Sequence, residues 1–398
     1  MKILIIHHVR RMENISIYSS DNFVAANNEV YGAQELDTWA GIRLLAAKHD
    51  VWRLEICPNQ SLARLVNERG EIVESITVKF PPGIMSLKDW AYVKALAKYG
   101  DSSISYFSRT QLTNFAEKIF SSHEFELLWW ETQFYDALIP GKIRSIIRSV
   151  NFEPAHVLSE DASRIRFLRF LFKLFSEWRI SRRRNLVAIS PADSYQYSRL
   201  CKSNPTVLPL RQLMFISETK FEIEESEKSF IFFGSNFNVR HNLLNLKFIL
   251  NDLAPLMQEK GISARISIFG HRMPSEQTMP PNVRYYGFAD NLQGKEMGSL
   301  GVIVPYHGGA GMQSKIFEPM ILGVPIIANP SNFAGYPFEP FEHYYPATNL
   351  SEYLDALEFF LLFPEVVSAM GNRAKVKSKE MFSRRKIESI IDDLIFEN

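Results

Sequence analysis

The stretch GVIVPYHGGAGMQSKIFEPMILGVPIIAN (301–329) decides the fold. An apolar run ends at Pro305 and Tyr306, a glycine-rich segment follows, and a helical pattern begins near Met312. A second apolar run then comes after a Gly–Val–Pro break. Strand, glycine loop, helix and strand in this order are typical of one βαβ unit in a parallel sheet.

The same stretch predicts a binding site for an anionic nucleotide. Lys315 and Glu318 fall one turn apart on one helix face, directly after Gly308, Gly309 and Gly311. A glycine loop and a helix N-terminus bind phosphate through backbone N–H groups, and a lysine adds a mobile positive charge. A carboxylate suits the paired hydroxyls of a ribose because it accepts two hydrogen bonds. The alternative is a plain surface Lys–Glu pair.

Short apolar runs alternate with helical patterns along the rest of the chain. The runs typical of strands are 2–8, 51–56, 126–131, 155–159, 185–190, 229–234, 264–270, 283–287, 300–306 and 324–329. Helical patterns cover 36–45, 241–261, 350–362, 364–381 and 383–396. This alternation predicts an α/β protein with two Rossmann-like, doubly wound domains facing a cleft. We expect an N-terminal domain at 1–205, with helix 383–398 packing back onto it, and a C-terminal domain at 206–382.

Further site candidates follow from where strands end, because ligands of open parallel sheets bind beyond the carboxyl ends of the strands. Gly234 and Ser235 come at the end of a strand run, and Arg240 stands at the entrance to the next helix. Small residues let backbone N–H groups approach a phosphate, and arginine can bind its oxygens in pairs. An ordinary turn is the alternative. His7, beside His8 at the end of the first run, either reaches the cleft or is structural.

Composition narrows the class of protein. Of 398 residues, 46% are hydrophobic and 22% charged, which excludes a disordered chain, a collagen-like repeat and a disulfide scaffold. Cys57 and Cys201 are far apart, which predicts two free thiols in a cytoplasmic protein. The dinucleotide and ATP phosphate-loop motifs are absent, as is metal-ligand spacing, so we expect no cofactor and no metal. The formal net charge of +1 is the sum of an N-terminal half near +5 and a C-terminal half near −4.

The segment ASRIRFLRFLFKLFSEWRISRRRN (162–185) explains that charge asymmetry. It carries eight Lys/Arg and one acid, interleaved with large apolar residues. That composition is typical of a helix lying on an anionic membrane surface. The alternative is a buried amphipathic helix with a solvated far side; nucleic-acid binding would need a recognition motif that is missing. The residues expected to face the membrane are Arg166, Arg169, Lys173, Trp178, Arg182 and Arg183.

The helix EPMILGVPII (318–327) resembles the Glu-Ala-Met-x-x-Gly-x-Pro helix of nucleotide-sugar glycosyltransferases with the GT-B fold, specifically family-4-like members. YGAQELDTWAGIRLLAAKHDV (31–51) is similar to their acceptor-side glycine loop, with Gly32, and first helix. NLVAISPADS (185–194) and the tail 350–394 also resemble segments of that family. The resemblance thus covers nearly the whole chain, and it implies that the second domain binds the donor.

One position departs from the family pattern. Retaining members carry two glutamates separated by seven residues; the second matches Glu318, but the first falls on Ala310. The first glutamate normally contacts the donor sugar. The sequence therefore leaves open whether the reaction retains or inverts the anomeric configuration.

The segment AHVLSEDASRIRFLRF (155–170) is similar to part of the membrane-associated glucuronosyltransferase of xanthan synthesis, an inverting enzyme with this fold. The position of its catalytic aspartate falls on Asp161, and Tyr306 and Lys315 match its donor-site motif. An inverting reaction needs one base that deprotonates the acceptor hydroxyl. Asp161 is the expected base and Glu160 the competing one; the alternative is that either residue caps a helix.

The resemblance implies a metal-independent transfer of a sugar from a nucleoside diphosphate donor to a glycan or lipid-linked acceptor. In this scheme Arg240 and Lys315 offset the diphosphate charge, while Tyr306 and Glu318 hold the nucleoside. The expected location is the cytoplasm, peripheral on the inner face of the membrane, with no nucleic-acid partner. Two alternatives stay open: a nucleotide-sugar 2-epimerase of the same fold, and a non-catalytic protein that binds nucleotide sugars.

Overall fold

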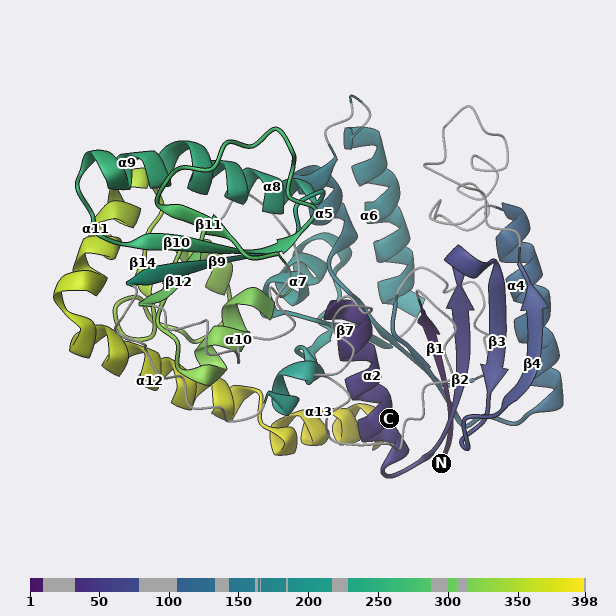
Figure 1. The fold of residues 1–398 in the computed structure, drawn as a ribbon. Coiled ribbons are helices and arrows are strands. Elements are labelled where there is room, and N and C mark those ends of the chain that lie inside the picture. Colours follow the sequence, from purple (N-terminus) through teal and green to yellow (C-terminus); the bar gives the residue numbers. More distant parts are fainter. Residues whose placement is uncertain are drawn as a thin grey trace.

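The computed structural model describes residues 1–9, 33–78, 106–132, 143–161, 164, 166–183, 185–216, 228–287, 300–305, 312 and 314–396. Within these residues two sheets form, one from each half of the chain, with helices packed around them (Figure 1). The fold is therefore α/β, with two Rossmann-like domains.

The first sheet has eight strands and is parallel except at one edge. In spatial order its strands are β4 (Ile72–Thr77), β3 (Leu62–Val66), β2 (Asp50–Cys57), β1 (Lys2–His8), β5 (Leu127–Trp130), β6 (Ser145–Arg148), β7 (Asn185–Ala188) and β8 (Thr206–Val207). The antiparallel pairs β2–β3 and β3–β4 come from a stretch with little sequence pattern. Because β8 joins this sheet, the sheet extends just beyond the domain limit predicted at residue 205.

The second sheet has six strands, and all its described pairings are parallel. In spatial order they are β11 (Val283–Tyr285), β10 (Arg265–His271), β9 (Ser229–Asn236), β12 (Gly301–Val304), β13 (Ile326–Ala328) and β14 (Tyr345–Pro346). Sequence periodicity predicted five of these strands. β14 is only a two-residue pairing, too short to produce an apolar run.

Helices connect the strands and cover the sheets. In the first half they are α2 (Ala33–Ala46), η1 (Pro58–Gln60), α4 (Tyr106–Ser122), α5 (Glu153–Glu160), α6 (Arg166–Arg183), α7 (Pro191–Gln196) and η3 (Tyr197–Cys201). The segment η4 (Arg211–Phe215) lies between the sheets in the sequence, and the second half has α8 (Arg240–Lys247), η5 (Phe248–Leu253), α9 (Ala254–Glu259), α10 (Ser314–Leu322), η7 (Pro330–Phe333), α11 (Leu350–Leu362), α12 (Pro364–Met381) and α13 (Arg384–Phe396).

The strand predicted over 155–159 is wrong, because this apolar run lies inside α5. Pro154 stands in the first turn of α5, where a missing N–H has no helical partner to lose, and it starts the helix. The strand that precedes α5 is the short run SIIR of β6. Short apolar runs fit buried strands and buried helices equally well, so periodicity alone could not separate them.

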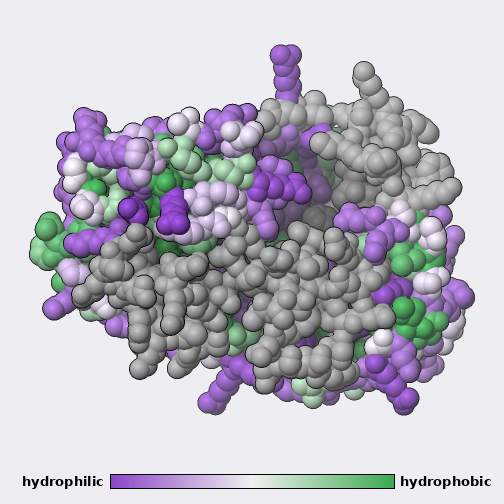
Figure 2. Space-filling model, viewed as in Figure 1, coloured by the Kyte–Doolittle hydropathy of each residue, from purple (hydrophilic) through white to green (hydrophobic). Residues whose placement is uncertain are grey.

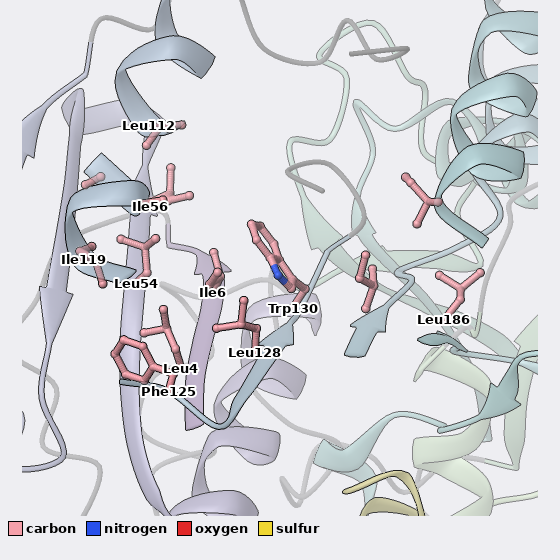
Figure 3. Packing of buried hydrophobic residues seen from close by; sticks show 14 of the residues in the cluster. Leu4, Ile6, Leu54, Ile56, Leu112, Ile119, Phe125, Leu128, Trp130 and Leu186 are labelled. Carbon is pink, nitrogen blue, oxygen red and sulfur yellow. The ribbon is translucent and has the colours of Figure 1, made fainter. Parts of the chain in front are cut away.

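Strand β1 shows how the core is divided between the two faces of the first sheet. Leu4 and Ile6 point to the face covered by α4, where they pack with Leu54, Ile56 and Trp130 (Figure 3). Ile3 and Ile5, which alternate with them along the strand, point to the opposite face, against α2 and α13. Successive strand residues alternate between faces, so a continuous apolar run requires helices on both sides.

Helix α13 returns to the first sheet from the end of the chain (Figure 1). Ile387, Ile391 and Ile395 recur every four residues and are buried in the same cluster as Ile3. At its surface, Lys48 Nζ lies 2.8 Å from Asp392 Oδ2. The last helix therefore ties the end of the chain to the domain that begins it.

The surface of the described residues is mostly hydrophilic in the view of Figure 2, with small separate hydrophobic patches. No helix among these residues is long and apolar enough to cross a membrane. Cys57 and Cys201 are both buried and unbridged.

Candidate functional site at the domain interface

Helix α10 places the two residues that the motif predicted. The buried side of the helix packs Ile316, Phe317 and Met320 into the second domain, and this packing leaves Lys315 and Glu318 half-buried. The helix ends before Gly323, which has a φ of +86°, a conformation that glycine adopts without strain. Lys315 and Glu318 are therefore held on a well-packed helix that follows strand β12 in the chain.

Lys315 lies between groups from both halves of the chain. Its Nζ is 3.5 Å from Asn242 Oδ1 of α8. Burial lowers the pKa of the Lys315 ammonium to about 8, although the carboxylate of Glu160 opposes this shift. A lysine that loses part of its hydration in this way gains most from an incoming anion.

Glu160 reaches across the interface to the start of α8. Its Oε1 is 2.7 Å from Nδ1 of His241, and the amide of His241 donates to its Oε2 at 3.4 Å. Burial lowers the pKa of His241, and the Lys315 charge adds to this effect, while the Glu160 hydrogen bond counteracts it. Glu160 is the last residue of α5, so a carboxylate of the first domain meets His241 and Lys315 of the second.

Asp161, the residue expected as the base, has a different neighbour. It follows the end of α5 rather than a strand, and Arg169 Nη1 of α6 donates to its Oδ2 at 2.9 Å. The expectation that it lies directly after a strand is wrong, because 155–159 is helical. Of the two adjacent acids, Glu160 is the one that faces Lys315 and His241.

Glu318 contacts the segment that joins the two sheets. Gln212 Nε2 of η4 donates to Glu318 Oε1 at 3.5 Å. The backbone amide of Leu210, two residues before Gln212, donates to Met312 Sδ at 3.4 Å. The connecting segment therefore lies against the N-terminal end of α10, where the nucleotide site was predicted.

A buried network of four charges anchors this connecting segment to the first domain. Arg211 donates in pairs to Glu131, at 2.7 and 2.6 Å, and to Asp37 at 3.0 Å. Arg148 Nη1 lies 2.6 Å from the same Asp37 carboxylate. Each of these side chains is at most 2% exposed, and Gly41 of α2 leaves the space that the Arg211 guanidinium occupies.

Sequence reasoning missed this network. Glu131 follows directly after the buried strand β5, and Arg148 is the last residue of the buried strand β6. A charge is unusual at either position, and that was the available signal. Burial alone opposes the ionisation of Asp37, but Arg148 and Arg211 lower its pKa below the ordinary value. The charges are thus stable only as a group.

His7 lies in the interior of the first domain. Its side chain has no exposed surface; its Nε2 is 3.9 Å from Glu55 Oε1, and its ring packs edge-on against Trp39. Burial lowers its pKa to about 4, so the ring is neutral at pH 7. These surroundings correspond to the structural alternative rather than to a residue that faces Glu160.

Gly234 lies within β9, not after it, because the strand continues to Asn236. A Cβ at Gly234 would come within 2.2 Å of the Phe237 ring, so packing explains the glycine.

Arg240 is exposed at the first residue of α8, next to His241.

Several predicted residues lie outside the described part of the chain. They are Gly32, Tyr306, Gly308, Gly309, Ala310 and Gly311, together with the side chains of Ser235 and Arg183. Among the described residues, no group of three or more His, Cys, Asp or Glu side chains could hold a metal ion.

Helix α6 exposes apolar side chains and buries an acid. Glu177 is 1% exposed and accepts a hydrogen bond from Tyr197 at 2.8 Å. On the outer face, exposed apolar side chains recur at helical spacing: Phe167 (63%), Leu168 (39%), Leu171 (45%), Phe175 (56%) and Trp178 (38%). A helix that only covers a sheet buries its apolar side chains and exposes its charged ones.

The basic residues of α6 divide into two groups. Arg169 and Lys173 are turned toward α5, where they pair with Asp161 and Glu153, so they do not belong to the outer face. Arg166 and Arg182 are exposed, and the Arg182 guanidinium lies 4.7 Å from the centre of the Trp178 ring.

Solved structures similar to this chain are glycosyltransferases with the GT-B fold. Sucrose-phosphate synthase from Thermosynechococcus elongatus has a TM-score of 0.65 and 13% identity, covering 99% of this chain and 98% of its own. HepE of Anabaena in complex with UDP has a TM-score of 0.62 and 13% identity, covering 99% of both chains. The lipopolysaccharide outer core galactosyltransferase WaaB has a TM-score of 0.52 and 13% identity, covering 100% of this chain and 99% of its own.

No protein-family model and no curated protein sequence matches the chain. At identities this low, the likeness establishes the fold, which is that of the GT-B glycosyltransferases.

Proposed function

We propose that this protein is a glycosyltransferase that moves a sugar from a nucleoside diphosphate donor to a glycan or lipid-linked acceptor. The observation that carries the proposal is the position of Lys315 and Glu318 on one face of α10, with Lys315 near Glu160 of the other domain. Chains with this fold include HepE, whose structure holds UDP-glucose. In this proposal the first domain binds the acceptor and the second binds the donor.

The leaving diphosphate would be stabilised by side-chain cations. Lys315 is partly desolvated and Arg240 is exposed at the N-terminus of α8, so both can bind an anion. Positive groups held in place stabilise charge that develops on the leaving oxygen. Glu318 would accept hydrogen bonds from the ribose. We propose a metal-independent reaction on this basis.

The acceptor base is assigned to Glu160 or Asp161, and the geometry favours Glu160. Its carboxylate lies beside His241 and Lys315 of the second domain, whereas Asp161 is paired with Arg169. In an inverting reaction one such carboxylate removes the acceptor proton as the hydroxyl attacks the anomeric carbon. The resemblance of 155–170 to an inverting enzyme supports this stereochemistry.

A thermal-shift panel of UDP-, GDP-, dTDP- and CMP-sugars tests the donor site. At least one donor should raise the melting temperature of the wild type and not that of Lys315→Ala. Lys260→Ala is the matched control, because Lys260 is exposed at the end of α9. If no nucleotide sugar stabilises the wild type, the donor site is refuted.

The configuration of the product then tests the base. NMR of the anomeric proton distinguishes inversion from retention. Glu160→Gln should lower kcat by about 10²- to 10⁴-fold, the usual contribution of general base catalysis. Asp161→Asn is the matched variant. If it abolishes activity while Glu160→Gln does not, the assignment passes to Asp161.

We further propose that α6 rests on an anionic membrane, which would place the enzyme on the inner face. Burying the exposed row that includes Phe167 and Phe175 would contribute roughly 25 cal/mol per Å² of apolar surface. Arg166 and Arg182 would each add on the order of 1 kcal/mol near anionic lipids. Their exposure beside aromatic residues supports a lipid surface as the partner.

Co-sedimentation with vesicles tests this surface. The wild type should bind phosphatidylglycerol vesicles and leave phosphatidylcholine vesicles unbound. Leu171→Ser should weaken binding roughly tenfold, as expected for losing one buried aliphatic side chain. Leu362→Ser changes an equally apolar exposed residue on α11 and should have no effect. Equal losses in both variants would refute α6 as the membrane surface.

A further inference from the structure

Gln212 has a buried polar atom without a partner. The residue is 5% exposed, and its side-chain Oε1 finds no hydrogen-bond partner among the residues that the structure describes. An amide carbonyl left in this state costs free energy, and native structures contain few of them. Its position beside the predicted nucleotide site suggests what pairs with it.

The backbone around Gln212 is fixed from the first domain. Arg211, the preceding residue, is held by the buried charge network, and the amide of Gln212 itself donates to Asp37 Oδ1 at 3.3 Å. The side chain then extends to α10, where Nε2 approaches Glu318 Oε1 at 3.5 Å. A rigid backbone therefore delivers this amide to the second domain.

The orientation of the amide follows from the chemistry of its neighbour. An ionised carboxylate only accepts hydrogen bonds, so the NH₂ group must face Glu318 and the carbonyl must be the unpaired atom. A carbonyl in that place accepts from an O–H or N–H donor. Beside Glu318, the group expected to supply such a donor is the ribose.

We infer that Gln212 is a donor-binding residue: its Nε2 orients Glu318, and its Oε1 accepts a hydrogen bond from a ribose hydroxyl of the nucleotide. This inference rests on the proposed function. The two hydroxyls of a ribose are two donors, and Glu318 and Gln212 together offer an acceptor to each. A site built in this way rejects an analogue that lacks one hydroxyl, because a buried acceptor is then left unpaired.

Deoxynucleotides test the inference. Calorimetry measures the Kd of UDP, GDP and their 2′-deoxy and 3′-deoxy analogues with the full chain. The wild type should bind at least one deoxy analogue tenfold or more weakly than its ribonucleotide. In Gln212→Met, which keeps the length of the side chain and removes its polar atoms, that ratio should fall close to one.

Gln258→Met is the matched control, because Gln258 is exposed on α9 and should leave the ratio unchanged. Gln212→Met should also melt at or above the wild-type temperature, because it removes an unpaired buried group. An unchanged ratio in Gln212→Met, or an equal loss of affinity for ribo- and deoxynucleotides, would overturn the inference and leave the proposed function intact. If the wild type binds none of these nucleotides, the proposed function fails together with it.

Discussion

Replacing Arg211 with methionine should destabilise the first domain strongly. The substitution keeps much of the side-chain volume and removes both bonds to Glu131, at 2.7 and 2.6 Å, and the 3.0 Å bond to Asp37. Two buried carboxylates would then share the single guanidinium of Arg148. Breaking a buried ion pair by removing one partner costs about 3–5 kcal/mol, a large part of the 5–15 kcal/mol that typically holds a domain.

Urea unfolding followed by tryptophan fluorescence measures this effect. Trp129 donates to Glu131 at 2.7 Å and reports on the network directly. With a urea slope of about 3 kcal/mol per M, the expected loss lowers the midpoint by roughly 1 to 1.7 M. The loss should shrink between pH 7 and pH 5, because one of the uncompensated carboxylates can then take up a proton.

Arg384→Met is the matched control. Arg384 is 62% exposed and pairs with Glu388 one helical turn away, a contact worth about 0.3–0.5 kcal/mol. The reasoning is refuted if Arg211→Met shifts the midpoint no further than Arg384→Met does, since the network would then contribute no more than a surface pair.

Three further expectations follow from packing and charge. Gly41→Ala should lower the urea midpoint by roughly 0.3–1 M, because the new Cβ would lie 2.0 Å from Arg211 Nη1. Replacing glycine with alanine in a helix usually leaves the midpoint unchanged or raises it, and either result here would contradict this packing. The affinity for inorganic pyrophosphate should fall as the pH rises through about 8, where Lys315 loses its proton, and calorimetry should find no such fall in Lys315→Arg. Burial lowers the pKa values of His7 and His8 from 6.5 to about 4. The unfolded chain therefore takes up protons at a higher pH than the folded protein, and the free energy of unfolding should fall as the pH decreases from 7 to 4. NMR should find two histidine rings that do not titrate between pH 7.5 and 5.

The elements of the fold were largely predictable from local pattern. Helix 350–362 was predicted with the bounds that α11 has, and the strand at 2–8 corresponds to β1. The exceptions have physical causes. The run at 155–159 became a helix because Pro154 begins one there, and β14 is too short to carry any period.

The candidate site was predictable where one segment supplies several of its residues. Lys315 and Glu318 belong to one helix, so their spacing alone puts them on one face. The different neighbours of Glu160 and Asp161 were not predictable, because adjacent residues near a helix end point in different directions. One meets His241 at 2.7 Å, and the other meets Arg169 at 2.9 Å.

By itself, the sequence determined that this is an α/β protein with two Rossmann-like domains, because periods of two and 3.6 residues and the turns between them are local properties. It also predicted an anion site after the strand at 300–306. The tertiary structure decided which residues meet at the interface. His241 is 81 positions from Glu160, and Arg211 is 174 positions from Asp37. Contacts over such separations depend on how two sheets and their connecting segment pack together, and no local period encodes that packing.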